Sequence, residues 1–393
     1  MTAPRAHPRT PHGRACMRRR RALPRRAGAC LLVAALLAGC VPFPRSTPPQ
    51  SWAYATWWLP VDAEGIVASR FDRLVYFDVT LAPDGTIADA HGWPDAHAPL
   101  RTSAQRLGIP LDVAVALHGR EPLARLFSSP QAVERLLQTC LALADDPAIA
   151  GLQLDFEVHE PMPRPALHSL RAFVPRLQRA LARRHPDLAL TVFVPVSRDP
   201  LYDRASLAKV DWVVMQGYDA HWTGSANAGP VAPLRGPEAV AWEHVASHAR
   251  ELGIRQARTL IGFPLYGYEW PVASREPSAR TLAAGVTRTL EPASGSAAMG
   301  NDSVRQRVNL YGCQRDAESA SSYYQFIDPQ QRHVTGWYES DWSLRKKAEF
   351  VREHRLAGLA FFAAGGDGYR LTGTYDAWRK ATPETPVAEP APC

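Results

Sequence analysis

The sequence predicts an α/β protein built on a (β/α)8 TIM barrel, and three observations support this prediction. Eight short apolar segments, rich in β-branched or aromatic residues, alternate with amphipathic segments of helical period. Strands that alternate with helices form parallel sheets. About 350 residues follow an N-terminal signal-like region, and a barrel of this kind takes about 250 residues plus insertions.

The eight expected strands share a length of five to nine residues and lie at 53–59, 74–81, 111–116, 151–157, 188–196, 210–215, 259–264 and 359–363. The clearest helix between them is 130–144. Ser129 can serve as its N-cap, and Pro130 occupies its first position. Its apolar residues recur on one face, at Val133, Leu136, Leu137, Cys140 and Leu141.

The stretch between the seventh and eighth strands is too long for a single helix. Residues 271–335 lie there, and we expect an inserted loop or subdomain at the barrel rim. The barrel as a whole is expected over 53–378. Residues 379–393, rich in Pro, Ala, Glu and Thr, are expected to be a disordered tail.

The N-terminus has the pattern of an export signal. Residues 17–40 combine an Arg-rich start, a short apolar run and a small-residue cleavage site. The ending Leu-Ala-Gly-Cys resembles a lipobox, which implies a lipoprotein signal over 1–39, lipidation of Cys40 and a tether over 40–52. Val41 after the cysteine suggests, by analogy with lipoprotein sorting, the outer membrane facing the periplasm. A plain secretory signal with a chance cysteine is the alternative.

The basic character of the chain comes from that signal. The whole sequence has a formal net charge of +7, but residues 1–39 contain nine Arg and no acidic residue. The remainder holds 36 basic and 38 acidic residues. It therefore lacks the overall positive field that attracts nucleic acid, and no nucleic-acid partner is expected.

Few cysteines remain beyond the signal. Cys140 falls on the apolar face of the expected helix, which favours burial. A disulfide between Cys313 and Cys393 would suit an oxidising compartment, and the sequence leaves it open. No Cys/His cluster has the spacing of a metal site, so no metal is expected.

The strand 151–157 holds the candidate catalytic residues. Side chains alternate across a strand, so the apolar residues of this segment share one face, while Gln153, Asp155 and Glu157 share the other. In a barrel the polar set points inward, with Glu157 at the C-terminal end, where barrel enzymes keep their active sites. Neighbouring carboxylates raise one another's pKa, which keeps one of them protonated as an acid. The alternative is a structural cluster paired with Arg.

This strand resembles the Asp-x-x-Asp-x-Asp-x-Glu signature of glycoside hydrolase family 18. Asp155 and Glu157 match the last two positions, while Ala150 and Gln153 replace the first two acids. The branch that hydrolyses spore and cell-wall peptidoglycan often has an amide at the second position and favours Asp-Phe-Glu at the end. Gln153 is uncharged, although its amide can hydrogen-bond Asp155.

Further motifs resemble the same family in the same order along 53–378. Tyr218 and Asp219 match a Met-x-Tyr-Asp motif, in which Gln216 replaces Met. Phe362 replaces the usual Trp of the last strand. Other segments resemble the peptidoglycan-hydrolase branch, namely Gly-Pro-Val-Ala-Pro at 229–233, the strand at 262–270, and Trp-Tyr-Glu at 337–339 with Ser343 and Lys347.

The resemblance implies a substrate-assisted retaining mechanism without metal or organic cofactor. Glu157 would be the general acid, Asp155 would orient the substrate's acetamido group, and Tyr218 would donate a hydrogen bond to it. Substrate binding is expected from the remaining candidates, Gln153, Gln216, Asp219, Trp222, Tyr266 and Phe362.

The partner implied is a glycan that contains N-acetylglucosamine, and a monomer anchored to the membrane through Cys40 is expected. Peptidoglycan is the first candidate substrate. A chitinase-like hydrolase acting on chitin-type oligomers is the second. A glycan-binding lipoprotein without turnover is the third, although lectin-like members of the family usually lack the acid that Glu157 provides here.

Overall fold

The computed structural model describes residues 48–59, 65–66, 70–197, 199–292 and 303–381, which belong to one compact unit. The expected signal, Cys40, most of the tether and the tail beyond 381 lie outside the described residues. Among the described residues, no helix has both the length and the apolar character needed to cross a bilayer.

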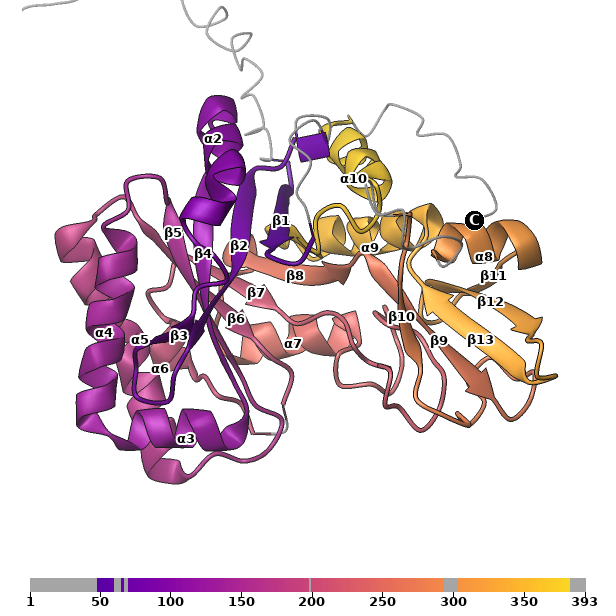
Figure 1. Cartoon of the computed structure of the whole chain (residues 1–393), viewed down its shortest axis with the longest axis horizontal. Helices are drawn as coiled ribbons and strands as arrows, with labels where there is room; N and C mark the ends of the chain where they lie inside the picture. Colours follow the sequence, from indigo (N-terminus) through magenta and orange to yellow (C-terminus); the bar gives the residue numbers. More distant parts are fainter. Residues whose placement is uncertain (1–47, 60–64, 67–69, 198, 293–302, 382–393) are drawn as a thin grey trace, which may run out of the picture. The chain divides into compact units, whose positions relative to one another are not determined.

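Eight parallel strands close into a barrel, as predicted (Figure 1). The closure is made by β1, which pairs in parallel with both β14 and β2. In chain order the barrel strands are β1 (Gln50–Thr56), β2 (Arg73–Leu81), β4 (Leu111–His118), β5 (Gly151–Glu157), β6 (Ala189–Val194), β7 (Trp212–Met215), β8 (Thr259–Pro264) and β14 (Gly358–Phe362). A short strand, β3 (Ile87–Asp89), adds antiparallel to β2.

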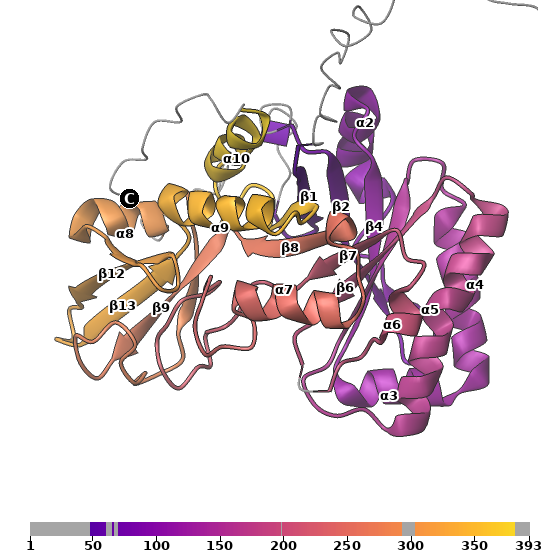
Figure 2. The same cartoon turned by 180° about the vertical axis from the view of Figure 1, so that it is seen from behind.

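Helices follow the barrel strands and cover them from outside; Figure 2 shows α7 and α9 in front of β6, β7 and β8. The helices of the barrel are α2 (Ala98–Leu107), α3 (Arg120–Ser128), α4 (Pro130–Ala144), α5 (Arg164–Arg184), α6 (Arg204–Leu207), α7 (Trp242–Glu251), α9 (Asp341–Glu353) and α10 (Arg370–Lys380). Helix α4 has the predicted bounds, and the Ser129 hydroxyl caps it by accepting a bond from the Ala132 amide. Cys140 is buried on its inner face, as predicted.

The expected insertion is a subdomain with its own five-stranded antiparallel sheet, in the order β10-β9-β13-β12-β11. It begins directly after β8 and ends at 338, so it is slightly longer than predicted. Its elements are β9 (Tyr266–Val272), β10 (Val286–Thr289), α8 (Val304–Tyr311), β11 (Gln314–Asp316), β12 (Ser321–Ile327) and β13 (His333–Tyr338). Cys313, next to β11, is disulfide-bonded; its expected partner Cys393 lies outside the described residues.

Several element boundaries differ from the predicted ones. The first barrel strand begins at Gln50, so the last three residues of the expected tether belong to the barrel. The segment 262–270, taken as one strand, is divided between β8 and β9. The chain turns at Leu265, whose amide is held by the Phe362 carbonyl at 2.7 Å, and then enters the second sheet. The last helix continues to Lys380, two residues beyond the expected end.

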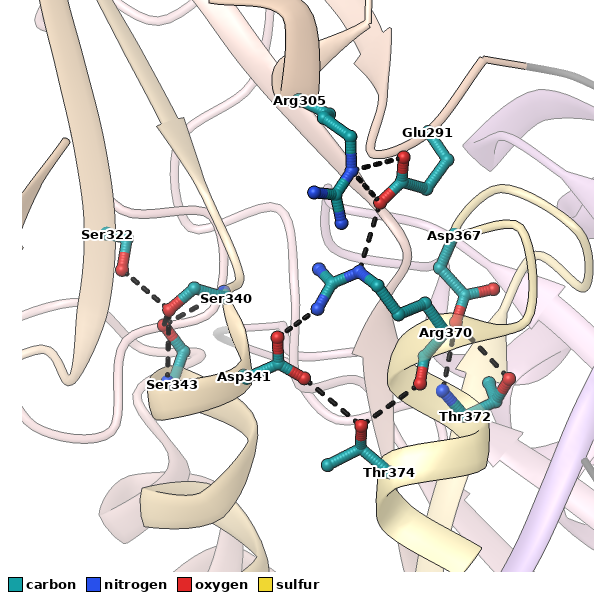
Figure 3. Close-up of polar contacts among 10 residues, drawn as sticks. All are labelled: Glu291, Arg305, Ser322, Ser340, Asp341, Ser343, Asp367, Arg370, Thr372 and Thr374. Carbon is teal, nitrogen blue, oxygen red and sulfur yellow. Dashed lines mark hydrogen bonds and ion pairs between the residues drawn. The ribbon is translucent and has the colours of Figure 1, made fainter. Parts of the chain in front are cut away.

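A polar network joins the segment after β10 to the last two helices (Figure 3). Arg370, at the start of α10, binds the Glu291 carboxylate at 3.0 Å and also pairs with Asp341 of α9. Arg305 of α8 reaches the same Glu291 carboxylate at 2.5 and 2.6 Å. The two anions and two cations thus connect α8, α9 and α10, which fixes the return of the chain from the second sheet into the barrel.

Candidate active site

The inner face of β5 presents the predicted polar side chains. Leu152 and Leu154 are fully buried in the core between the strands and the outer helices. The alternate positions Gln153, Asp155 and Glu157 therefore point into the barrel, as the period of two predicts. Glu157 is the last residue of the strand, at the C-terminal mouth.

Gln153 lies deepest of the three and is completely buried. Its Nε2 donates a hydrogen bond to the Tyr54 hydroxyl at 2.7 Å, and its Oε1 accepts none within the described part of the chain. The Gln153 amide N–H₂ thus binds Tyr54 and not Asp155, which was its other possible partner. Tyr54 belongs to β1, across the barrel interior from β5, and its phenol oxygen is the acceptor for the Gln153 amide. The Asp155 side chain lies nearer to the mouth. Gln153 therefore supports the barrel floor.

Glu157 has the protonation state of an acid. Burial raises its pKa to about 8, and the negative charge of Asp155 adds to the effect, while His118 opposes it. Asp155 is 2% exposed, whereas the Glu157 side chain keeps 24% of its surface open at the mouth. At neutral pH Glu157 therefore holds a proton and can deliver it to a bound molecule.

His118, which the sequence analysis missed, completes this group. It ends β4, where the register pairs it with Glu157. Its Nε2 lies 3.7 Å from Asp155 Oδ1 and 3.5 Å from Glu157 Oε1. Burial would lower the pKa of His118, but the nearby charge of Asp155, with a further contribution from Glu157 when that group is ionised, raises it to about 9. The imidazole is therefore a cation at neutral pH.

The same three side chains have the geometry that a metal ion could use. One ligand atom from each of His118, Asp155 and Glu157 lies within 4.8 Å of the others. This compactness also follows from simple ion pairing, since an imidazolium between two carboxylates draws all three together. No metal was expected from the sequence. His118 lies 37 residues from Asp155 along the chain, and this separation is not a recognisable metal-site spacing.

Tyr218 follows β7 and enters the mouth beside an aromatic floor. Its ring stacks on Phe362 with centroids 5.9 Å apart, and Phe362 also packs against Tyr54 at 5.4 Å. Burial raises the pKa of the Tyr218 hydroxyl well above its ordinary range, and the charges of Glu157 and Asp155 contribute. The phenol therefore stays protonated and can donate a hydrogen bond.

Gln216 and Asp219 hold the loop that carries Tyr218. Gln216 accepts a bond from the Val196 amide at 2.9 Å and donates to the Tyr218 carbonyl at 3.3 Å. Asp219 has a left-handed backbone, with φ of 62°, and accepts bonds from the hydroxyls of Tyr266 at 2.6 Å and Tyr268 at 2.9 Å. Asp219 thus ties the barrel loop to the first strand of the second sheet.

A cavity of about 540 Å³ opens between the rim of the barrel mouth and the second sheet. Three predicted binding residues line it: Asp219, Tyr266 and Phe362. Others were missed by the sequence analysis, among them Trp58, Tyr268 and Arg288. Trp58 lies two residues after the end of β1, a position that signals function in this fold; Tyr268 and Arg288 have no such signal because only the second sheet brings them there.

Trp222 stands apart from this cavity. Its side chain is 54% exposed and does not line it. Its carbonyl accepts a hydrogen bond from the Trp270 indole at 3.2 Å, which anchors the loop to β9. The indole itself is an exposed apolar face beyond the cavity, so its binding role stays a prediction.

Comparison with known proteins agrees with this architecture. Residues 111–367 match the glycosyl hydrolases family 18. The putative sporulation-specific glycosylase YdhD of Bacillus subtilis (strain 168) is 27% identical over 297 residues, which cover 72% of this chain and 63% of YdhD. The chain thus spans less than two thirds of that relative's length.

Two solved structures share the fold. A mutant GH18 chitinase from Cycas revoluta, in complex with (GlcNAc)4, has a TM-score of 0.71 at 20% identity and covers 84% of this chain and 100% of its own. The spore cortex-lytic enzyme SleL of Bacillus megaterium QM B1551 has a TM-score of 0.64 at 18% identity. This comparison covers 85% of the present chain and 75% of the SleL chain. The family match extends over more than half of the sequence, from β4 to the segment after β14, and the chain belongs to glycosyl hydrolase family 18.

Proposed function

We propose that this protein cleaves N-acetylglucosamine linkages in peptidoglycan by substrate-assisted, retaining catalysis. The observation that supports this most is the pair at the end of β5: a buried Asp155 beside a Glu157 whose pKa is raised to about 8. A glycosidase needs a protonated acid next to a fixed anion, and these two residues supply both. Membership of glycosyl hydrolase family 18 supports a glycosidase activity.

In the proposed first step Glu157 gives its proton to the glycosidic oxygen. The bond between that oxygen and the anomeric carbon breaks, and the carbonyl oxygen of the substrate's own N-acetyl group attacks the same carbon. No enzyme nucleophile is needed. Asp155 orients the acetamido N–H and stabilises the positive ring that forms, while the Tyr218 hydroxyl donates a hydrogen bond to the acetamido group.

In the second step water opens this ring. The Glu157 carboxylate removes a proton from the water, whose oxygen forms the new bond to the anomeric carbon, and the acetamido group is restored. Two displacements at one carbon leave the anomeric configuration unchanged. The same side chain acts as acid and then as base, which its position at the open end of β5 permits.

Peptidoglycan is proposed as the substrate because of the roles of similar proteins and because of the N-terminal pattern. YdhD is named a putative sporulation-specific glycosylase, and SleL is a spore cortex-lytic enzyme. A lipid at Cys40 would hold the barrel beside the cell wall, at the outer membrane facing the periplasm. Chitin-type oligomers are the second candidate, since the similar Cycas revoluta chitinase binds (GlcNAc)4.

The test is digestion of isolated peptidoglycan and, separately, of chitin oligomers by the purified protein, with products identified by mass spectrometry. Glu157→Gln is the inactive variant. Glu160→Gln is the matched control, because Glu160 is an exposed glutamate three residues away. We expect new reducing N-acetylglucosamine ends from peptidoglycan with the wild type and the control, and none with Glu157→Gln.

Other outcomes would redirect the proposal. Cleavage of chitin oligomers alone would replace the substrate and keep the mechanism. Binding without turnover on either glycan would contradict the enzymatic proposal and leave a glycan-binding protein.

A further inference from the structure

His118 lies where a single cation can contact both acidic residues of the site. Its Nε2 is within 3.7 Å of one oxygen of Asp155 and within 3.5 Å of one oxygen of Glu157. The contacted oxygen of Asp155 is buried and accepts no hydrogen bond among the described residues. The imidazole is therefore the cation that faces this otherwise unsatisfied oxygen.

We propose that His118 is a positioning residue that, as an imidazolium, holds Asp155 and Glu157 in the arrangement that proton transfer requires. The proposal rests on the glycosidase function proposed above, and it assigns the residue a role that the sequence motifs do not contain. The strands fix the approach, because β4 and β5 pair in register with His118 opposite Glu157.

The neutral Gln153 explains why the cation is needed on this side. Gln153 lies on the inner side of Asp155 and directs its amide N–H₂ to Tyr54, so it supplies neither charge nor proton to the carboxylate. An anion with low exposure is costly without a partner. His118 provides that partner from the side of the mouth, where its own side chain keeps 49% of its surface exposed.

The charges balance before and during the reaction. In the resting site an anionic Asp155 and a cationic His118 flank a protonated Glu157. When Glu157 releases its proton to the glycosidic oxygen, a second anion forms, and the imidazolium 3.5 Å away stabilises it. When water adds, Glu157 takes a proton back. Asp78 of β2 also acts on His118 and favours the cation further.

A titration that needs no turnover tests the ion pair directly. Histidine imidazole signals of the purified protein are followed by NMR from pH 5 to pH 10, and the His118 signal is identified by its loss in His118→Gln. We expect His118 to titrate near the value of about 9 instead of the ordinary value of about 6.5. In Asp155→Asn its pKa should fall by about one unit or more.

A His118 signal that titrates at the ordinary value in both proteins would overturn the proposal. A His118 signal that moves when EDTA is added would overturn it too, because a bound metal ion would then explain the geometry. Circular dichroism of Asp155→Asn checks that the variant is folded. Because no catalysis is measured, this result stands even if neither glycan is cleaved.

Kinetics then test the consequence for catalysis. His118 lowers the pKa of Glu157, so removing the cation in His118→Gln should raise that pKa and move the alkaline limb of the pH profile of kcat/KM upward by about one pH unit. His168→Gln is the matched control, since His168 is exposed on the outer helix α5. A His118→Gln profile with lower activity but unmoved limbs would contradict the proposal, because a merely structural role would give that result.

Discussion

Gln153 donates a hydrogen bond to the Tyr54 hydroxyl across the barrel interior, over 2.7 Å and between residues 99 positions apart in the sequence. This bond leaves Asp155 without a carboxyl neighbour on its inner side. The cationic partner of this site lies at the mouth instead, where His118 Nε2 is 3.7 Å from Asp155 Oδ1 and 3.5 Å from Glu157 Oε1.

Replacement of Gln153 by Glu should shift the acidic limb of the pH profile. The new carboxyl would keep the length of the side chain and could still bind Tyr54, but it would add a negative charge on the inner face of β5, and a like charge opposes ionisation of the acidic pair above it. The pair would then take up its second proton at higher pH, so kcat/KM should begin to fall at higher pH on the acid side. An acidic limb that coincides with that of the wild type would show that the two positions do not interact.

Because the pKa of Glu157 is raised, the wild-type protein should lose stability as the pH rises toward about 8. The folded state keeps this proton up to about pH 8, whereas the unfolded chain loses it near the ordinary Glu pKa of about 4.3. Between these values the folded state binds more protons, so stability falls as pH rises. Glu157→Gln should therefore melt at a higher temperature than the wild type at pH 8, and the difference should shrink toward pH 5. Equal differences at both pH values in calorimetry would refute this.

Removal of the Tyr218 hydroxyl should reduce turnover without unfolding the protein. Tyr218→Phe keeps the ring that stacks on Phe362 but deletes the donor aimed at the acetamido group. Loss of one such donor costs about 10²–10³-fold in kcat. Tyr311→Phe makes the same chemical change on the exposed face of α8 and should leave kcat unchanged. Equal activities of the two variants would exclude Tyr218 from the mechanism.

The Trp-Tyr-Glu…Ser…Lys motif should affect stability instead of catalysis. Glu339 and Lys347 form an ion pair in which both side chains are completely buried. Lys347 also donates to the Ala320 carbonyl at 2.9 Å, which connects α9 to the second sheet. Lys347→Met leaves the Glu339 carboxylate without its cation and should cost about 3–5 kcal/mol of unfolding free energy.

The double variant Glu339→Gln with Lys347→Met should recover part of that loss, because no buried charge remains without a partner. Denaturant unfolding measures both proteins. A double variant less stable than Lys347→Met would mean that Glu339 contributes mainly through its bond from Ser321, at 2.8 Å.

The barrel could be predicted from the sequence because its signals are local. Each strand is a short apolar run, and the alternation along 151–157 assigned Asp155 and Glu157 to the inner face. The helix 130–144 was predicted to the residue because Ser129 and Pro130 mark its start and one apolar face spans its length.

The missing parts depend on contacts between distant segments. The strand that ends in His118 was expected to stop at Ala116, so the histidine was not recognised as a residue of the barrel mouth. The second sheet pairs β9 with β13 across some sixty residues, and no local pattern indicates that pairing. Tyr268 and Arg288 reach the cavity only through it, and the Tyr54 partner of Gln153 is equally distant in the sequence.

In the proposed mechanism Glu157 gives its proton to the glycosidic oxygen while the substrate's own acetamido group attacks the anomeric carbon. The most direct test is a proton NMR record of the first product released from a soluble N-acetylglucosamine oligomer or peptidoglycan fragment, taken before the sugar mutarotates. We expect the new reducing end to have the same anomeric configuration as the linkage that was cleaved. The opposite configuration would contradict it, because water would then have attacked the anomeric carbon in a single displacement.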